Sequence, residues 1–547
     1  MRKSKLVDKK IKSRVFIIGF DGATFNVIRP MLASGKLPNL QKIINEGAHG
    51  ILNSTLPAHS CPAWTSLATG VHPGTHGIYG FFNRQKGKYS YPTVNSNQIQ
   101  SPTMWEILSA QNYKIGVVNV PVTYPPMSVN GVMISGMLSP DMKSAFHPQS
   151  LYSEIKKAVP NYQVEVRSPE KNEEYLEEAF QNIQRRTALF KHLVDSNDFD
   201  FFMNVYTELD RIQHFYWAAM DLKNPMHSKN LPEAMKNGIE QTYKALDHSL
   251  HDVFERMTDD DLLLIVSDHG FEGVYKLFRV NQWLEKNGYL KKKIGFGKMI
   301  VKIKKMLIRM GLQTFFRKVQ KRVPIAKQHD VSNLPFVRDI NWKKTKAIYG
   351  PNMGININRK GEYPQGIVSD KDYESLCDEI IAKLKKTTDL DGFSPFEAIY
   401  KREEIHSGQA LNLAPDIRMV LGRRPDGSGK YQLNSEFSGD IFAYSPRIHA
   451  SHKKEGVIFA YGKNVKSGAK IENAGIWDIL PTVFSHLGAK IPNHVEGETI
   501  SEMFEKENSL KFYDYQSQIS EKSEEEMNSE QAKKIENRLR ELGYLED

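Results

Sequence analysis

Acidic and histidine side chains follow several apolar runs of this 547-residue chain in patterns that suit metal binding. In TELDRIQH, Asp210 and His214 are four residues apart, which on a helix places both side chains on one face, where they could ligate the same ion. A surface Asp/His pair would show the same spacing. Asp268 and His269 directly follow the run LLLIVS, and a histidine beside a buried strand is costly unless it is bonded or ligates a metal. Asp21 follows VFIIGF in the same way, although an acid there could instead cap a helix.

A sixth candidate ligand is His452 in HASHKKEGVIFAYG, which precedes the last strand-like run. His449, three residues earlier, is a rival that the spacing alone leaves open. Three aspartates and three histidines form a donor set of oxygen and nitrogen that suits zinc or manganese better than calcium. We therefore expect two divalent metal ions, with zinc as the first choice and manganese as the alternative. Such a pair would stabilise the entering and leaving oxygens of an in-line displacement at phosphorus.

A candidate nucleophile lies in STLPAHSCPAWTSLATGVHPGTHGI, where Ser60 stands two residues before Pro62. A hydroxyl is a weak nucleophile at its ordinary pKa and needs a base or direct metal coordination to react at neutral pH. We expect coordination to be the device here. Cys61 competes for this role, although it could equally be a small buried apolar residue.

The elements that must position these side chains are short apolar runs separated by stretches with helical spacing. The runs are Val15 to Phe20, Ile115 to Val120, Phe199 to Tyr206, Asp261 to Asp268 and Gly456 to Gly462, with a further strand at 417–421 and helical stretches at 173–194, 240–257 and 372–386. Such uninterrupted runs suit strands buried on both faces, which predicts an α/β fold with a mainly parallel central sheet and helices on both faces. Ligand sites in these sheets form beyond the carboxyl ends of the strands, so Asp21, Asp210 and Asp268 could meet in one crevice.

Positive charge is concentrated in one segment. The chain has 74 Lys and Arg against 64 Asp and Glu, a net charge of +10, yet 13 of the basic residues and no acid lie between Lys291 and His329. A nucleic-acid-binding protein spreads its charge over a surface, so we expect no nucleic-acid partner. The segment is interpreted either as a solvated cap helix over the cleft or as an amphipathic helix at residues 291–329. The second would rest on anionic lipid and bring the protein to a lipid-linked phosphate substrate.

These patterns predict four parts of the chain. They are an N-terminal part of the catalytic α/β domain at 1–285, a basic helical insertion or cap at 286–340, the remainder of the catalytic domain at 341–510 and a C-terminal helical tail at 511–547. Within the tail, we expect residues 515–547 to form a solvated helix that carries no chemistry. Two cysteines are too few for a disulfide framework, and the apolar run of six residues after the basic N-terminus is too short for a signal sequence or a membrane span. We expect a cytoplasmic protein, with a peripheral position at the membrane as an option.

Nearly the whole chain resembles the alkaline phosphatase superfamily, in particular its type I phosphodiesterase/nucleotide pyrophosphatase branch. The segments that carry the resemblance are IIGFDGAT, KLPNLQKIINEGAHG, the stretch from Ser60 through ATGVHPGTHGI, TELDRIQH, VSDHGF, SHKKEGVIFAYG and DILPTVFSHLG. The resemblance implies that Asp210, His214 and His452 hold one ion, that Asp21, Asp268 and His269 hold the other, and that Ser60 is the nucleophile. It also favours His452 over His449, because the strand at Gly456 follows His452 at the family's distance.

Departures from the family's patterns bear on the substrate. Sulfatases continue from their modified residue with x-Pro-x-Arg, whereas Ala63 and Trp64 follow Pro62 here. Pyrophosphatases place an Asn soon after HGI to hold a phosphoryl oxygen; this chain has Phe81 at that spacing and Asn83 two residues later, so Asn83 is a candidate substrate-binding residue. No counterpart of the phosphate-clamping Arg of monoesterases is identified in the sequence, which favours a diester.

The sequence therefore predicts a metal-dependent phosphohydrolase that cleaves phosphodiester or nucleotide-type pyrophosphate bonds through a phosphoenzyme on Ser60. The expected partner is a phosphate-ester substrate, either a nucleotide or a lipid-linked one. The alternatives are a phosphomonoesterase or sulfatase-like hydrolase of the same superfamily, and a non-catalytic basic module that binds a membrane surface.

Overall fold

Strand β1 (Val15–Phe20) is buried along its whole length at the centre of a nine-stranded sheet. The computed structural model of the chain describes residues 13–166, 172–228, 232–293, 335–445, 448–506, 508–515 and 529–541. Because side chains alternate across a strand, Phe16 and Ile18 join the apolar cluster on one face of the sheet, and Val15 and Ile17 join the cluster on the other. This is the double burial that an uninterrupted apolar run predicts.

The sheet is mainly parallel, as predicted. Its strand order is β17 (Ala469–Gly475), β2 (Ala48–Asn53), β16 (Glu455–Tyr461), β7 (Leu262–Val266), β1, β6 (Phe201–Tyr206), β3 (Ile115–Val118), β4 (Gly131–Ile134) and β5 (Phe146–His147). Strands β7, β1, β6, β3 and β4 all run parallel, while β16 is antiparallel to both of its neighbours and β5 is antiparallel to β4. The carboxyl ends of the central strands therefore meet at one edge of the sheet.

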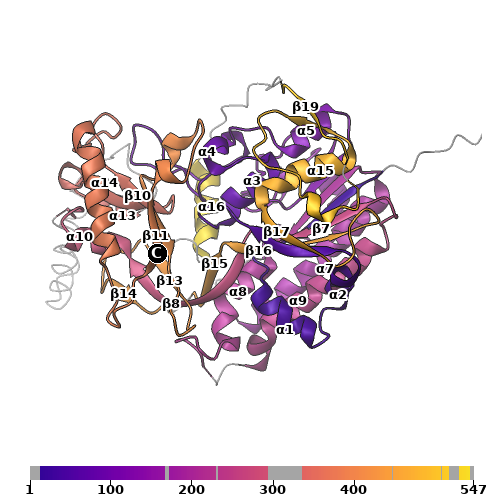
Figure 1. The fold of residues 1–547 in the computed structure, drawn as a ribbon, viewed down its shortest axis with the longest axis horizontal. Helices are drawn as coiled ribbons and strands as arrows, with labels where there is room; N and C mark the ends of the chain where they lie inside the picture. The colour runs from indigo at the N-terminus through magenta and orange to yellow at the C-terminus, as the bar shows by residue number, and fades with distance from the viewer. Residues whose placement is uncertain are drawn as a thin grey trace, which may run out of the picture.

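Helices cover both faces of this sheet, as predicted (Figure 1). One face is covered by α1 (Phe25–Ala33), α2 (Pro38–Glu46), α6 (Leu151–Ala158), α7 (Glu173–Ser196), α8 (Glu208–Met220) and α9 (Glu233–Phe254). The other face is covered by α3 (Ser60–Thr69), α5 (Met104–Ala110) and α15 (Ile479–Leu487). The architecture is therefore the α/β sandwich of helices around a sheet that the sequence indicates.

A smaller lobe lies beside this sheet, at the left of Figure 1. It contains an antiparallel sheet in the order β11 (Phe396–Lys401), β12 (Ile417–Leu421), β10 (Gly354–Ile357) and β9 (Ala347–Gly350), together with α10 (Val280–Lys286), α13 (Pro335–Arg338) and α14 (Asp370–Lys385). The long strand β8 (Gly270–Arg279) connects the lobes and pairs with β13 (Lys430–Asn434), β14 (Phe442–Ala443) and β15 (Ala450–Lys453).

The C-terminal tail is more closely packed than predicted. Residues 511–513 form β19 (Lys511–Tyr513), which pairs with β18 (Lys490–Pro492). Helix α16 (Ser529–Glu541) is not solvated on all sides, because Ile535 and Leu539 are fully buried in the same apolar cluster as the small lobe. The prediction of a solvated terminal helix is therefore wrong for this face of α16.

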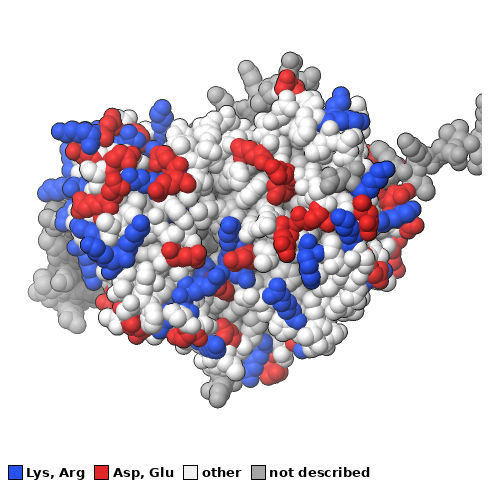
Figure 2. Space-filling model, viewed as in Figure 1, with Lys and Arg blue, Asp and Glu red and all other residues white. Residues whose placement is uncertain are grey.

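Residues 294–334, which include all but the first three residues of the basic segment predicted at 291–329, lie outside the described residues, so the role of that segment as a cap or membrane contact stays a prediction. Over the face shown in Figure 2, basic and acidic side chains are interspersed. Among the described residues, no helix has both the length and the apolar character that a membrane crossing needs.

Gly19 in β1 offers a test of the packing between the sheet and α3. A Cβ atom there would lie 2.6 Å from Trp64 Cη2 and 2.8 Å from Val205 Cγ2, so Gly19→Ala should lower the free energy of unfolding by about 1–3 kcal/mol in urea denaturation. Gly80→Ala is the control, because its Cβ would meet nothing closer than the Pro351 carbonyl oxygen at 3.7 Å. Equal losses in the two variants would contradict this account of the packing.

Candidate active site

Three neighbouring strands deliver the candidate ligands to one point. Gly19 of β1 pairs with Val205 of β6 and with Val266 of β7, so the three parallel strands end at the same level. Asp21 follows β1 directly, and Asp268 and His269 follow β7. The helix N-cap at this corner is Thr24, so Asp21 does not cap α1. The local sequence thus places carboxylates at the carboxyl ends of adjacent strands, where parallel sheets form their ligand sites.

The remaining ligands come from α8 and from β15. Asp210 and His214 lie one helical turn apart on α8, which begins two residues after β6. His452 lies on β15, directly opposite Phe271 of β8 in the antiparallel pairing. Since Phe271 is two residues after His269, this pairing carries His452 to the site from a point nearly two hundred residues further along the chain.

Asp210, His214 and His452 form the first set. Their candidate ligand atoms all lie within 4.8 Å of one another. Oδ1 of Asp210 is 3.2 Å from Nε2 of His452 and 3.5 Å from Nε2 of His214, and the two Nε2 atoms are 3.0 Å apart. His449, the rival, is not part of this set; its backbone N–H donates to the His214 carbonyl.

Asp21, Asp268 and His269 form the second set, again within 4.8 Å of one another. Nε2 of His269 is 3.2 Å from Oδ2 of Asp268 and 3.7 Å from Oδ1 of Asp21. The same Nε2 is 4.0 Å from Oδ1 of Asp210 in the first set. The two sets are therefore neighbours in one buried centre.

Each of the three histidines is oriented by a backbone carbonyl. Nδ1 lies 2.9 Å from the Ala450 carbonyl oxygen in His214, 3.3 Å from that of Gly270 in His269 and 3.2 Å from that of Ala58 in His452. A carbonyl only accepts, so Nδ1–H is the donor in each ring and Nε2 is the nitrogen directed toward the carboxylates. Burial lowers the pKa of His214 to about 4 and that of His269 well below its usual range, which keeps both rings neutral.

The carboxylates have opposite electrostatic surroundings. Burial, and then the charges of Asp268 and Asp210, raise the pKa of Asp21 well above its ordinary value. Burial and the charge of Asp210 likewise raise the pKa of Asp268 to about 8. Burial acts in the same sense on Asp210, but His214 and Arg211 overcome it and hold its pKa well below the usual range.

The residues present fit two divalent cations. All six side chains are at most 8% exposed, and they offer only carboxylate oxygen and imidazole nitrogen. Oδ1 of Asp21 and Oδ2 of Asp268 are buried and accept no hydrogen bond from the described residues. A buried carboxylate oxygen without a donor is costly, and a cation at this point would remove that cost.

Ser60 is the first residue of α3 and lies beside the second set. Its Oγ is 3.3 Å from Nε2 of His269, and the side chain is 1% exposed. The N-terminus of a helix carries partial positive charge, which favours a phosphoryl group at this position. Cys61, the competing nucleophile, packs in an apolar cluster, and burial raises the pKa of its thiol well above the ordinary value.

Three further residues of the centre were not found from the sequence. His59 is the N-cap of α3, where its Nδ1 accepts a hydrogen bond from the Cys61 N–H at 3.4 Å. The Trp64 indole N–H donates to Oδ2 of Asp21 at 3.1 Å, and Nη1 of Arg211 donates to Oδ2 of Asp210 at 2.7 Å. The one sequence signal that could have indicated these residues was their closeness to predicted site residues: His59 and Trp64 lie within four residues of Ser60, and Arg211 directly follows Asp210.

Asn83, the predicted substrate-binding residue, is bonded within its own loop. Its amide donates to the Gly77 carbonyl at 2.8 Å, while its Oδ1 is buried and accepts no hydrogen bond from the described residues. Its neighbour Phe81 stacks edge-on against His59, with ring centroids 4.4 Å apart, so this loop lies near Ser60. A contact of Asn83 with substrate stays a prediction.

Comparison with known proteins identifies the family. A family model described as type I phosphodiesterase/nucleotide pyrophosphatase matches residues 15–451. The chain belongs to this family. The type I phosphodiesterase/nucleotide pyrophosphatase family is part of the alkaline phosphatase superfamily, so the protein is a hydrolase of phosphoric ester bonds of the phosphodiesterase/pyrophosphatase type.

Solved structures of similar proteins show the same fold. Phosphonoacetate hydrolase from Sinorhizobium meliloti 1021, in complex with phosphonoformate, is 13% identical with a TM-score of 0.52, over 87% of this chain and 96% of that one. Human ectonucleotide pyrophosphatase/phosphodiesterase 5 is 12% identical with a TM-score of 0.51, over 90% of this chain and all of that one. A search among curated proteins found no match. These likenesses place the type I phosphodiesterase/nucleotide pyrophosphatase fold over most of the chain.

The N-cap of α3 offers a test of how Ser60 is positioned. His59→Ala should lower the free energy of unfolding by about 1 kcal/mol, because the Cys61 N–H loses its acceptor, whereas His59→Asn should retain most of the stability because an Asn side chain also caps helices. Chemical denaturation of both variants measures the difference. If Asn restored nothing relative to Ala, the cap would not be the reason for the loss.

Proposed function

We propose that this enzyme hydrolyses a phosphodiester or a nucleotide-type pyrophosphate with Ser60 as the nucleophile and two divalent ions as cofactors, zinc first and manganese as the alternative. One observation carries the proposal. The Ser60 hydroxyl lies at the start of helix α3, with its Oγ 3.3 Å from Nε2 of His269 in the second set. The same Nε2 lies 4.0 Å from Oδ1 of Asp210 in the first set. A single hydroxyl beside two adjoining cation sites is the arrangement that an in-line phosphoryl transfer needs.

Cations bound by the two sets would neutralise the phosphoryl oxygens and stabilise the attacking and leaving oxygens. In the first step the Ser60 hydroxyl loses its proton to solvent as Oγ forms a bond to phosphorus, and the ester oxygen on the opposite side departs with the electron pair of the broken P–O bond. The positive end of the α3 dipole lies at Ser60 and favours the negative charge of the phosphoryl group. In the second step a water oxygen forms a bond to phosphorus and gives up a proton, the bond between Oγ and phosphorus breaks, and Oγ takes up a proton to restore the Ser60 hydroxyl.

The side chains around these ligands act by holding them in place. Trp64 donates to Asp21, Arg211 donates to Asp210, and the backbone N–H of Gly22 donates to Oδ1 of Asp268 at 3.2 Å. Each of these bonds occupies one carboxylate oxygen and leaves the other directed toward the centre. Such supporting bonds fix ligand orientation and commonly matter as much as the ligands.

Removal of the Ser60 hydroxyl tests the nucleophile. Ser60→Ala should lose activity on a chromogenic phosphodiester by about 10³-fold or more, because the variant lacks the hydroxyl that is proposed to form the covalent intermediate. Ser60→Thr is the matched control, since it keeps a hydroxyl, and it should retain measurable turnover. Mass spectrometry of acid-quenched wild-type protein should find the phosphoryl adduct on the peptide that contains Ser60. Full activity of Ser60→Ala would refute the assignment.

Removal of one ligand tests the cation sites. Asp268→Asn should lower the metal content of the purified, zinc-loaded protein from about two ions to about one per chain, because a neutral amide is a poor zinc ligand. Asp198→Asn, at an exposed acid outside both sets, should leave the metal content unchanged. Elemental analysis gives the numbers, and a full complement of metal in Asp268→Asn would count against the second site.

A further inference from the structure

A buried glutamine between two ligands of the first set has no role in the mechanism above. Gln213 lies three residues after Asp210 on α8 and directly precedes His214, and its side chain is fully buried. Residues three apart on a helix are neighbours, so the Gln213 side chain leaves α8 close to Asp210. Burial of an amide is costly unless both of its ends have hydrogen-bond partners. The identity of those partners indicates what this residue does.

One partner of the amide is the loop at 21–24, which follows β1. Nε2 of Gln213 donates to the Gly22 carbonyl at 2.8 Å. Gly22 directly follows Asp21, a ligand of the second set, and its own N–H donates at 3.2 Å to Oδ1 of Asp268, another ligand of that set. Through Gly22, a side chain of the helix that carries two ligands of the first set therefore holds two ligands of the second.

The other end of the amide is fixed by Tyr243 of α9. The Tyr243 hydroxyl donates to Oε1 of Gln213 at 3.3 Å and accepts the Thr24 N–H at 2.9 Å. Because a carbonyl only accepts, the Gly22 carbonyl requires the Nε2 end of the amide and leaves Oε1 for the hydroxyl. Burial raises the pKa of Tyr243, so the hydroxyl keeps the proton that it donates. Gln213 and Tyr243 together thus hold the loop at 21–24 from two helices.

The packing around Gly22 connects the same loop to the first set. Gly22 has a φ of +76°, which favours glycine, and a Cβ atom there would lie 2.8 Å from the Phe271 ring and 3.2 Å from Nε2 of Gln213. The centroid of the Phe271 ring is 4.8 Å from that of His214 and 5.2 Å from that of His452, two ligands of the first set. The position of the loop therefore depends on one apolar contact and one polar contact, and the polar one is Gln213.

We propose that Gln213 is a positioning residue that holds the second cation site in register with the first. The inference rests on the proposed function and adds to it the side chain that sets the spacing of the two ions. Two ions stabilise the entering and the leaving oxygen of an in-line displacement, so their spacing matters most in the transition state. Without the amide, the loop at 21–24 loses its bond to α8, and the second set then binds its ion less tightly.

Gln213→Met tests this role, because methionine keeps the length of the side chain and removes both hydrogen bonds. Zinc affinity is measured on the full-length protein by competition with a chromogenic chelator. One of the two zinc ions should bind about tenfold to hundredfold more weakly than in the wild type, and the affinity for the other should be unchanged. At saturating zinc, kcat for a chromogenic phosphodiester should fall by about tenfold while KM stays within about twofold, because the lost interaction acts in the transition state.

The Asp268→Asn variant shows which of the two ions depends on Gln213. This variant is expected to retain the ion of the first set alone, so Gln213→Met in the same background should leave the affinity for the remaining zinc ion unchanged. A loss of about tenfold or more in that background would place the effect of Gln213 on its own helix, and it would overturn the inference.

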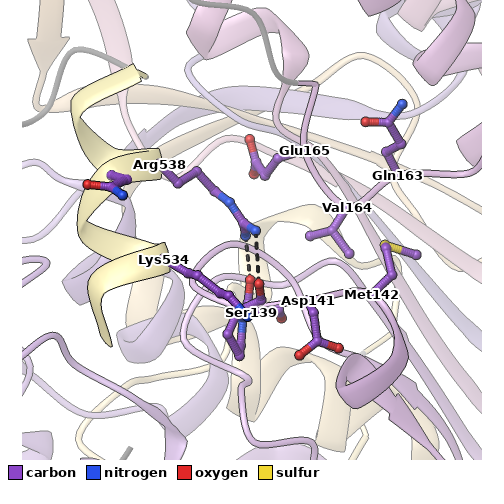
Figure 3. Close-up of a pocket in the computed structure, with 10 residues that line it drawn as sticks. Ser139, Asp141, Met142, Gln163, Val164, Glu165, Lys534 and Arg538 are labelled. Atoms are coloured by element: carbon purple, nitrogen blue, oxygen red, sulfur yellow. Dashed lines mark hydrogen bonds between the residues drawn. The ribbon is translucent and has the colours of Figure 1, made fainter. Parts of the chain in front are cut away.

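Arg538 of α16 provides the matched control for the loss of a buried polar side chain. Its guanidinium donates to the backbone carbonyls of Ser139 and Pro140, much as Gln213 donates to that of Gly22. Figure 3 shows these bonds beside a pocket of about 630 Å³, and neither set contributes to the described residues that line it. Arg538→Met should lower the midpoint of urea denaturation and leave both zinc affinities unchanged. An equal loss of zinc affinity in Arg538→Met and Gln213→Met would show a general structural effect and overturn the inference.

Tyr243→Phe decides the question if Gln213→Met does not fold. It deletes the one hydroxyl that holds Oε1 of the amide, so the same zinc ion should bind about threefold more weakly. Unchanged zinc affinity in the folded variant would overturn the inference. A wild type that binds no second zinc ion would overturn it together with the metal assignment. A wild type that binds two zinc ions but hydrolyses no phosphodiester would overturn the proposed reaction alone, and the zinc affinities would still decide on Gln213.

Discussion

The burial of three carboxylates around one histidine ring is the constraint on which the rest of the molecule depends. Asp21, Asp210 and Asp268 all lie within 4.0 Å of Nε2 of His269 and are at most 1% exposed. Such a cluster of like charges is unfavourable on its own, as the raised pKa values of Asp21 and Asp268 show. Divalent cations at the two candidate sites would offset this cost, as the proposed function requires.

The scaffold around this centre holds the ligands rigidly. Strands β1, β6 and β7 end at one level, carbonyls of the backbone orient all three histidines, and an indole, a guanidinium and a backbone N–H each bind one carboxylate oxygen. Little of this support comes from flexible surface side chains. The geometry is therefore set by main-chain groups and by the buried side chains of Trp64 and Arg211, which is the arrangement that preorganised catalytic sites require.

Much of the fold and of the site was predictable because its signals are local. The uninterrupted apolar runs gave the buried strands, and the spacing of Asp210 and His214 gave one helical face. The grouping of six ligands into two sets came from the resemblance to a family, because pairing of Asp210 with His452 depends on a contact across 242 residues that no local pattern encodes.

The residues that support the ligands, and the packing of α16 against the small lobe, could not be predicted because they also depend on contacts between residues far apart in the sequence. The polar, charged composition of the tail favoured a solvated helix, although Ile535 and Leu539 stand four residues apart and so share one face of α16. That spacing was the available signal. Its partner surface, which includes Leu138, is distant in sequence and could not be inferred from the helix alone.

The spread of the ligands along the chain has a consequence for biosynthesis. Asp21 emerges from the ribosome almost first, whereas His452 follows after more than four fifths of the polypeptide has been made. All three residues of the set Asp21, Asp268 and His269 are therefore synthesised 183 residues before His452 completes the other set. Of the two proposed cation sites, the one beside Ser60 is thus the first whose ligands have all been made, and the other waits for β15.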